Sequence, residues 1–67
     1  MRIILKDPVL LENIVMELAE MYSYSGIRFN VPSGSIMNIP RQLIDDVKHT
    51  LEEKNITPNM YSIEEDL

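Results

Sequence analysis

Few side chains in this sequence could do chemistry, and most of those are carboxylates. His49 is the single histidine, and it follows Asp45 by four residues, which places both on one side of a helix. Two ligands do not make a metal site, and the chain has no cysteine to complete one. We therefore expect no metal and no cofactor, and we interpret His49 as a solvated surface side chain.

Other candidates for catalysis are carboxylates and serines. The carboxylate pairs are neighbours in sequence and diverge on a helix, so they resemble solubilising charge more than an acid–base dyad. These pairs are Asp45-Asp46, Glu52-Glu53 and Glu64-Glu65. No base stands beside Ser23, Ser25, Ser33 or Ser35, and two glycines are too few for a phosphate-binding loop. The sequence predicts a protein that is not an enzyme and has no catalytic residues.

Composition narrows the classes of partner. A chain of 67 residues with 45% hydrophobic residues predicts one small globular domain. The net charge of -5, without a basic stripe, argues against nucleic acid and favours basic peptides. No apolar stretch approaches the roughly 20 residues that span a bilayer, so we expect no membrane contact. The start of the chain is too short and too soon charged for a secretory signal, which predicts a cytoplasmic location.

The first elements follow from local signals. The β-branched run at residues 2–5 predicts a short strand. Asp7 can cap a helix and Pro8 suits its first position, so we expect a helix over residues 8–21. Its apolar side chains recur at helical spacing: Leu11, Ile14, Val15, Leu18 and Tyr22.

A hairpin is predicted next, with Ser25-Gly26 as its two-residue loop. Tyr24 would then pair with Ile27, and Tyr22 with Phe29, which sorts apolar from polar side chains without error. The apolar face would hold Tyr22, Tyr24, Ile27, Phe29 and Val31, and the polar face Ser23, Ser25, Arg28 and Asn30. Pro32 would end the second strand because it lacks a backbone donor.

A second amphipathic helix is predicted to begin near Pro40, with an apolar stripe of Leu43, Ile44, Val47 and Leu51. Asn55 would take the left-handed conformation after this helix, and Ile56 would fold back on its last turn. We expect residues 1–56 to form one α+β domain of order β-α-β-β-α, with both helices on one face of a short antiparallel, hairpin-based sheet. Residues 57–67 are expected to be a flexible acidic tail.

Two motifs carry a family resemblance. Val31-Pro32-Ser33-Gly34-Ser35-Ile36, followed by a helix that starts Pro40-Arg41-Gln42-Leu43, resembles the TubC-type N-terminal docking domains of nonribosomal peptide synthetase and hybrid polyketide synthetase subunits. That family has a strand ending in Ala-Pro-x-Gly-x-Leu and then a Pro-led helix with a Lys near its end. The resemblance covers roughly residues 9–54. The shorter hairpin, the extra first strand and the absence of a closing Glu-Leu-Leu run point to a variant like the docking domains of rhabdopeptide synthetases.

The resemblance implies a function. Such a monomeric domain binds the C-terminal docking segment of an upstream synthetase subunit by β-strand addition and so sets subunit order. Residues 57–67 would link it to a downstream condensation domain. The residues expected to bind the segment are Tyr22, Ser23, Tyr24, Ser25, Ile27, Arg28, Phe29, Asn30, Val31, Leu43 and Val47. The acids expected to select basic residues on it are Glu20, Asp45 and Asp46.

Two alternatives stay open from the sequence. One is a small phage- or plasmid-type protein that binds a host protein and inhibits or regulates it, which a free-standing short gene would favour. The other is a ribbon-helix-helix repressor, because the chain starts with a strand and then a helix. The hairpin predicted between the two helices argues against the repressor, and gel filtration would detect its obligate dimer.

Overall fold

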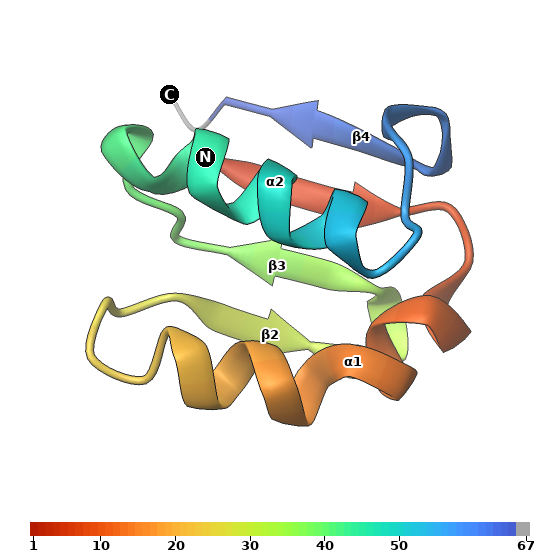
Figure 1. The fold of residues 1–67 in the computed structure, drawn as a ribbon, viewed down its shortest axis with the longest axis horizontal. Coiled ribbons are helices and arrows are strands. Elements are labelled where there is room, and N and C mark those ends of the chain that lie inside the picture. Colours follow the sequence, from red (N-terminus) through yellow and green to blue (C-terminus); the bar gives the residue numbers. More distant parts are fainter. Residues whose placement is uncertain (66–67) are drawn as a thin grey trace.

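The computed structural model describes residues 1–65 as a small α+β domain. Its four strands form one antiparallel sheet in the order β2-β3-β1-β4, and both helices cover the same face of it (Figure 1). This β-α-β-β-α-β arrangement is the split β-α-β, or ferredoxin-like, topology. The predicted fold class is confirmed, with one strand more than expected. In chain order the elements are β1 (Arg2–Leu5), α1 (Pro8–Met21), β2 (Arg28–Asn30), β3 (Ser35–Met37), α2 (Ile44–Glu53) and β4 (Tyr61–Glu64).

The N-terminal strand and helix match the prediction. The Asp7 carboxylate accepts a hydrogen bond from the Val9 backbone N–H at 3.1 Å, and Pro8 opens α1. The inner face of α1 buries Leu11 and Leu18 completely against the sheet. Local capping and helical periodicity therefore suffice to fix this part of the fold.

The end of α2 is also as predicted. Asn55 has φ of +65°, and its N–H donates to the Glu52 carbonyl at 2.9 Å. The Ile56 N–H donates to the Leu51 carbonyl at 2.9 Å, which completes a Schellman motif. Ile56 is buried on the last turn, so this cap also contributes to the core.

The predicted hairpin at Ser25-Gly26 is wrong. Tyr22 to Ser25 form a turn that ends α1: the Tyr22 N–H donates to the Leu18 carbonyl at 3.0 Å, and the Ser25 hydroxyl donates to the Tyr22 carbonyl at 2.6 Å. Gly26 does supply a positive φ, of +77°, but it leads the chain from a helix into a strand. The alternation that suggested a hairpin also fits a helix end followed by an edge strand.

The actual hairpin joins β2 to β3 through Val31–Ser33 and Gly34. Gly34 has φ of +69°, and its N–H donates to the Val31 carbonyl at 3.0 Å. A Cβ at Gly34 would stand 3.1 Å from the Pro8 Cα and 3.3 Å from the Leu5 carbonyl oxygen. Glycine therefore lets the hairpin connection pack against the start of α1.

The expected flexible tail is wrong for the described residues. Residues Tyr61–Glu64 form β4 and pair with β1, from Leu5↔Tyr61 to Arg2↔Glu64. A signal was present in the alternation of Tyr61 and Ile63 with Ser62 and Glu64. Residues 66–67 of the predicted tail lie outside the described residues, and the linker role stays a prediction.

β1 is the central strand, although it is only four residues long. It has β3 on one side and β4 on the other, so both of its edges are occupied within one chain (Figure 1). A ribbon-helix-helix protein needs its N-terminal strand for pairing with a second copy. The repressor alternative is therefore wrong.

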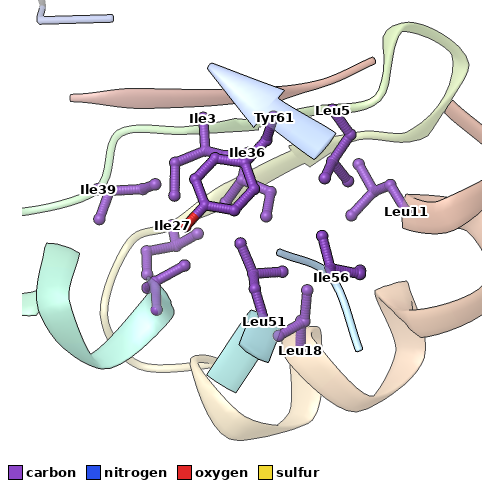
Figure 2. Packing of buried hydrophobic residues seen from close by; sticks show 11 residues of the cluster. Ile3, Leu5, Leu11, Leu18, Ile27, Ile36, Ile39, Leu51, Ile56 and Tyr61 are labelled. Atoms are coloured by element: carbon purple, nitrogen blue, oxygen red, sulfur yellow. The ribbon is translucent and has the colours of Figure 1, made fainter. Parts of the chain in front are cut away.

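The core fills the space between the sheet and the helices (Figure 2). Burial of a large aliphatic side chain contributes roughly 1.5–3 kcal/mol, which makes these contacts the main support of so small a domain. The buried apolar residues are Ile3, Leu5, Leu11, Leu18, Ile27, Ile36, Ile39, Val47, Leu51, Ile56 and Tyr61.

Candidate functional site: the free edge of β2

The sheet has two edge strands, β2 and β4. β2 pairs only with β3, and its other edge faces away from α2 (Figure 1). An edge strand presents unpaired backbone N–H and C=O groups that another chain can use. Of the predicted peptide-binding segment at residues 27–31, Arg28–Asn30 form this edge strand, Ile27 precedes it and Val31 begins the following turn.

The alternation of hydrogen-bonded and non-hydrogen-bonded pairs along the sheet determines which backbone groups of β2 are free. The Leu5 N–H donates to the Gly34 carbonyl at 2.9 Å, and hydrogen-bonded pairs recur every second residue in an antiparallel ladder. The pair Ile3↔Ile36 is therefore hydrogen-bonded, and Ile36 directs its N–H and C=O toward β1. It follows that β3 cannot also use these groups to bind β2 at this position.

The same alternation then assigns the groups of β2. Arg28 and Asn30 bond to β3 opposite Met37 and Ser35, whereas Phe29 forms a pair with Ile36 that lacks hydrogen bonds. The N–H and C=O of Phe29 accordingly point to the free edge. The Ile27 carbonyl belongs to the same peptide unit as the Arg28 N–H, which points to β3, and it therefore also points to the free edge. An added strand would find a donor and an acceptor at Phe29 and a further acceptor at Ile27.

The two sides of this edge differ in chemistry. Phe29 lies on the helix side, with Ile36, and is half-buried. Pro8 of α1 lies against the hairpin at Gly34, and Glu12, Val15 and Ala19 follow it on the same side of the helix after about one, two and three turns. Val15 is half-buried, whereas Glu12 and Ala19 are exposed. We define Val15, Ala19 and Phe29 as the apolar strip.

The other side of the edge carries a charge without a partner. Arg28 is exposed on the open face of the sheet and makes no ion pair or side-chain hydrogen bond within residues 1–65. By contrast, Arg2 lies 3.1 Å from Glu64, and Lys54 pairs with Glu17 across the helix layer. Arg28 is thus available to an anionic group next to the edge.

The residues before β2 were expected to form a binding strand, and they do not. The Tyr22 hydroxyl lies 3.1 Å from the Thr50 hydroxyl, and the Thr50 hydroxyl also donates to the Asp46 carbonyl at 2.9 Å. Tyr22 therefore ties the end of α1 to α2. Ser23 and Tyr24 are exposed in the loop that leads into β2. Tyr24 is the fully exposed aromatic side chain of this loop.

The predicted contacts to the second helix are not at the β2 edge. Val47 is 1% exposed and belongs to the core, and Leu43 packs against that core from the turn before α2. Residues 1–65 contain no pocket between the hairpin and α2. A strand added to β2 would therefore contact α1 rather than α2.

The three acids expected to select a basic segment are exposed, but they belong to the helix layer. Asp45 and Asp46 occupy the first turn of α2, where carboxylates stabilise the positive end of the helix dipole. Glu20 lies in the last turn of α1. The structure does not bring these acids together at the free edge of β2, and their selective role stays a prediction.

The described residues show no second chemical site. No group of three or more potential metal ligands occurs within residues 1–65. The Tyr61 hydroxyl is buried without a hydrogen-bond partner there, and desolvation, with Glu52 as a smaller cause, raises the pKa of Tyr61. Its ring lies among the core side chains (Figure 2), so we interpret it as a core residue.

No protein-family model, curated protein or solved structure matches this chain. Within the described residues, neither helix has the length and apolar character needed to cross a membrane. Within residues 1–65, the free edge of β2 combines unpaired backbone groups with an unpaired charge, which makes it the candidate site.

Proposed function

We propose that this chain is a non-catalytic interaction domain that binds an extended peptide segment as a fifth strand beside β2. The observation that carries the proposal is a free strand edge with the Phe29 N–H and C=O and the Ile27 C=O directed outward, between the apolar strip and an unpaired Arg28. In β-augmentation, main-chain hydrogen bonds supply affinity and alternate side chains supply specificity. The outward backbone groups of β2 can supply the hydrogen bonds, and the apolar strip and Arg28 can select the side chains of the ligand.

The sequence resemblance suggests whose segment this is. We propose the C-terminal docking segment of an upstream synthetase subunit, whose pairing would set subunit order in a peptide natural-product assembly line. The order α1-β2-β3-α2 supports this, since it keeps a helix, a hairpin and a helix in sequence. The run Val31 to Gly34 lies inside the hairpin rather than between the hairpin and the second helix. The order of the elements therefore supports this proposed partner more strongly than the Val31 to Gly34 motif does.

Moderate affinity follows from the size of the edge. β2 has three residues, so only a few main-chain hydrogen bonds can form with an added strand. A segment that is disordered before binding also loses conformational entropy when it pairs. We expect dissociation constants in the micromolar range, which corresponds to about -8 kcal/mol at 1 μM.

The test is an NMR titration of ¹⁵N-labelled protein with peptides copied from the C-termini of synthetase subunits encoded beside this gene. The expected result is saturable shifts at residues 27–31 and at Val15 and Ala19, with few changes along β4. Scrambled peptides of the same composition serve as the control. Saturable shifts confined to α2 or β4 would contradict the proposal, and so would the absence of shifts with every peptide.

A further inference from the structure

The edge of β2 also specifies the charge of its ligand. Given the proposed function, we propose that the bound segment places an Asp or Glu opposite Arg28, between two apolar residues. An acidic domain with a net charge of -5 would suggest a basic ligand instead. The charges that face this edge, rather than the charge of the whole chain, decide the preference.

The backbone phase determines which ligand residue meets Arg28. A strand added antiparallel to β2 would form a hydrogen-bonded pair with Phe29, whose N–H and C=O point outward, and would find its next acceptor at the outward Ile27 carbonyl. The ligand residue opposite Arg28 then belongs to a pair without hydrogen bonds, in which Cα atoms approach to about 4.5 Å and side chains lie closest. A carboxylate there can contact the Arg28 guanidinium directly.

The neighbours of Arg28 favour an anion at that position. Across the open face, Arg28 pairs with Met37 on β3 and Arg2 on β1 pairs with Glu64 on β4. Extending the Ile3↔Ile36 register by one residue places Met37 next to Arg2, which completes one row. Glu64 is already paired with Arg2 at 3.1 Å, which leaves Arg28 as the unpaired charge of this row. A ligand Lys or Arg would stand opposite a like charge, which destabilises a cross-strand pair.

The residues on either side of the ligand carboxylate would point to the helix layer, because side chains alternate along a strand. There they meet the side of the sheet that holds the apolar strip, with Phe29 from β2 and Val15 from α1. The carboxylates of α1 and α2 belong to the helix layer, which covers one face of the sheet (Figure 1), whereas the strand register places Arg28 on the open face. An apolar–acidic–apolar triplet therefore complements both sides of the edge.

The experiment selects binders from a library of random linear dodecapeptides displayed on phage, with the full chain as the target. Selected peptides are synthesised, and contacts between the Hα of Arg28 and a ligand Hα identify the residue opposite Arg28. We expect Asp or Glu at that residue. Its replacement by Gln should weaken binding about three- to fivefold, and by Lys about tenfold.

Two variants complete the test. Arg28→Glu should invert the preference, so that the Lys peptide binds better than the Glu peptide. Lys6→Glu makes the same change in net charge at an exposed lysine without an ion pair in residues 1–65, and it should leave the preference unchanged. Peptides that shift residues 27–31 but bind equally with Glu, Gln or Lys would overturn this inference and leave the proposed function standing. A library that yields no peptide bound at β2 would overturn both.

Discussion

The two edges of the sheet are protected in different ways. β4 pairs with β1 over four residues, and its Glu64 is held by Arg2 at 3.1 Å. Beyond it, Glu65 lies 3.7 Å from Arg41. β2 pairs over three residues and carries Arg28, which has no ion partner in residues 1–65. The charges at the β4 edge are therefore paired within the chain, whereas the charge at the β2 edge is not paired within residues 1–65.

A charge on an edge strand can have two consequences. Charged side chains on edges oppose pairing with other chains. Where the charge is already paired, as at Glu64, a new strand gains little from it. Where it is unpaired, as at Arg28, the same side chain opposes cationic strands and attracts anionic ones. We therefore interpret β4 as a structural edge and propose β2 as the binding edge.

Removal of the aromatic side chain that anchors each edge strand should have the largest effect on stability. Tyr61 of β4 is 5% exposed, so Tyr61→Ala should lower the free energy of unfolding by about 3 kcal/mol. Phe29 of β2 is half-buried, and Phe29→Ala should cost about 1–2 kcal/mol. Urea denaturation followed by circular dichroism measures both. Equal losses would show that the two edges are anchored equally.

The glycines on either side of β2 and its hairpin give the next effect. Gly34→Ala forces a side chain into the left-handed region of backbone conformation and places a Cβ 3.1 Å from the Pro8 Cα. We therefore expect the free energy of unfolding to fall by about 2 kcal/mol or more. Gly26→Ala has the strain alone, since nothing lies within 4 Å of its Cβ, and should cost about 1 kcal/mol. Thermal unfolding compares the pair. If Gly26→Ala were the more damaging change, the packing assigned to Gly34 would be incorrect.

Tyr61→Phe tests a smaller, pH-dependent term on the β4 side. Burial raises the pKa of Tyr61, so the folded state holds this proton more tightly than the unfolded chain. The corresponding stability is present below the ordinary tyrosine pKa of about 10 and is lost as the pH rises through the folded value. Because the hydroxyl has no partner in residues 1–65, Tyr61→Phe should be as stable as the parent, or more so, at pH 7.

Urea titrations at pH 7, 9, 10 and 11 separate these effects. The parent chain should lose more stability than Tyr61→Phe between pH 9 and 11. An identical decline in the two proteins would mean that other groups cause the alkaline unfolding. A clear loss for Tyr61→Phe at pH 7 would mean that the hydroxyl makes a stabilising hydrogen bond.

The smallest effects concern the two edge arginines. Arg2→Ala removes an ion pair whose side chains are 40% and 49% exposed, and screening limits its cost to about 1 kcal/mol or less. Arg28→Ala removes no intramolecular partner, so its stability should stay within about 0.5 kcal/mol of the parent. Denaturation at low and high salt distinguishes them, since only the Arg2 effect should shrink with salt. A larger cost for Arg28 would reveal a partner within the chain.

The parts of the fold that are set by local chemistry could be predicted. The Asp7 cap with Pro8 and the Asn55 cap with Ile56 each depend on contacts within one turn of a helix, and both are confirmed. The strand at Arg2–Leu5 was also visible from its β-branched residues. For these elements the sequence signal and the final contact involve the same few residues.

Strand pairing could not be predicted as well, because it depends on residues far apart in the chain. Ile36 pairs with both Ile3 and Phe29, and no local pattern links these three positions. The same holds for β4, whose partner lies at the other end of the chain. Within the candidate site, a strand was predicted over residues 27–31, and β2 occupies Arg28–Asn30 of that range. The sequence could not predict that Arg28 has no ion partner in residues 1–65, because ion pairs such as Arg2–Glu64 join residues far apart in the chain.

The most direct measurement compares the two edges by backbone N-methylation in chemically synthesised protein. The Phe29 N–H points to the free edge of β2. In the other ladder, the Lys6 N–H donates to the Met60 carbonyl at 2.9 Å, so hydrogen-bonded pairs alternate from there along β4. Ile63 belongs to a pair without hydrogen bonds, and its N–H therefore points to the free edge of β4. Neither methyl group removes a hydrogen bond within the sheet, so both variants should keep the parent circular dichroism spectrum. N-methyl Phe29 should abolish binding of a peptide selected at β2, and N-methyl Ile63 should leave its affinity unchanged. Unchanged binding by N-methyl Phe29, or loss with N-methyl Ile63 alone, would contradict the assignment of β2 as the binding edge.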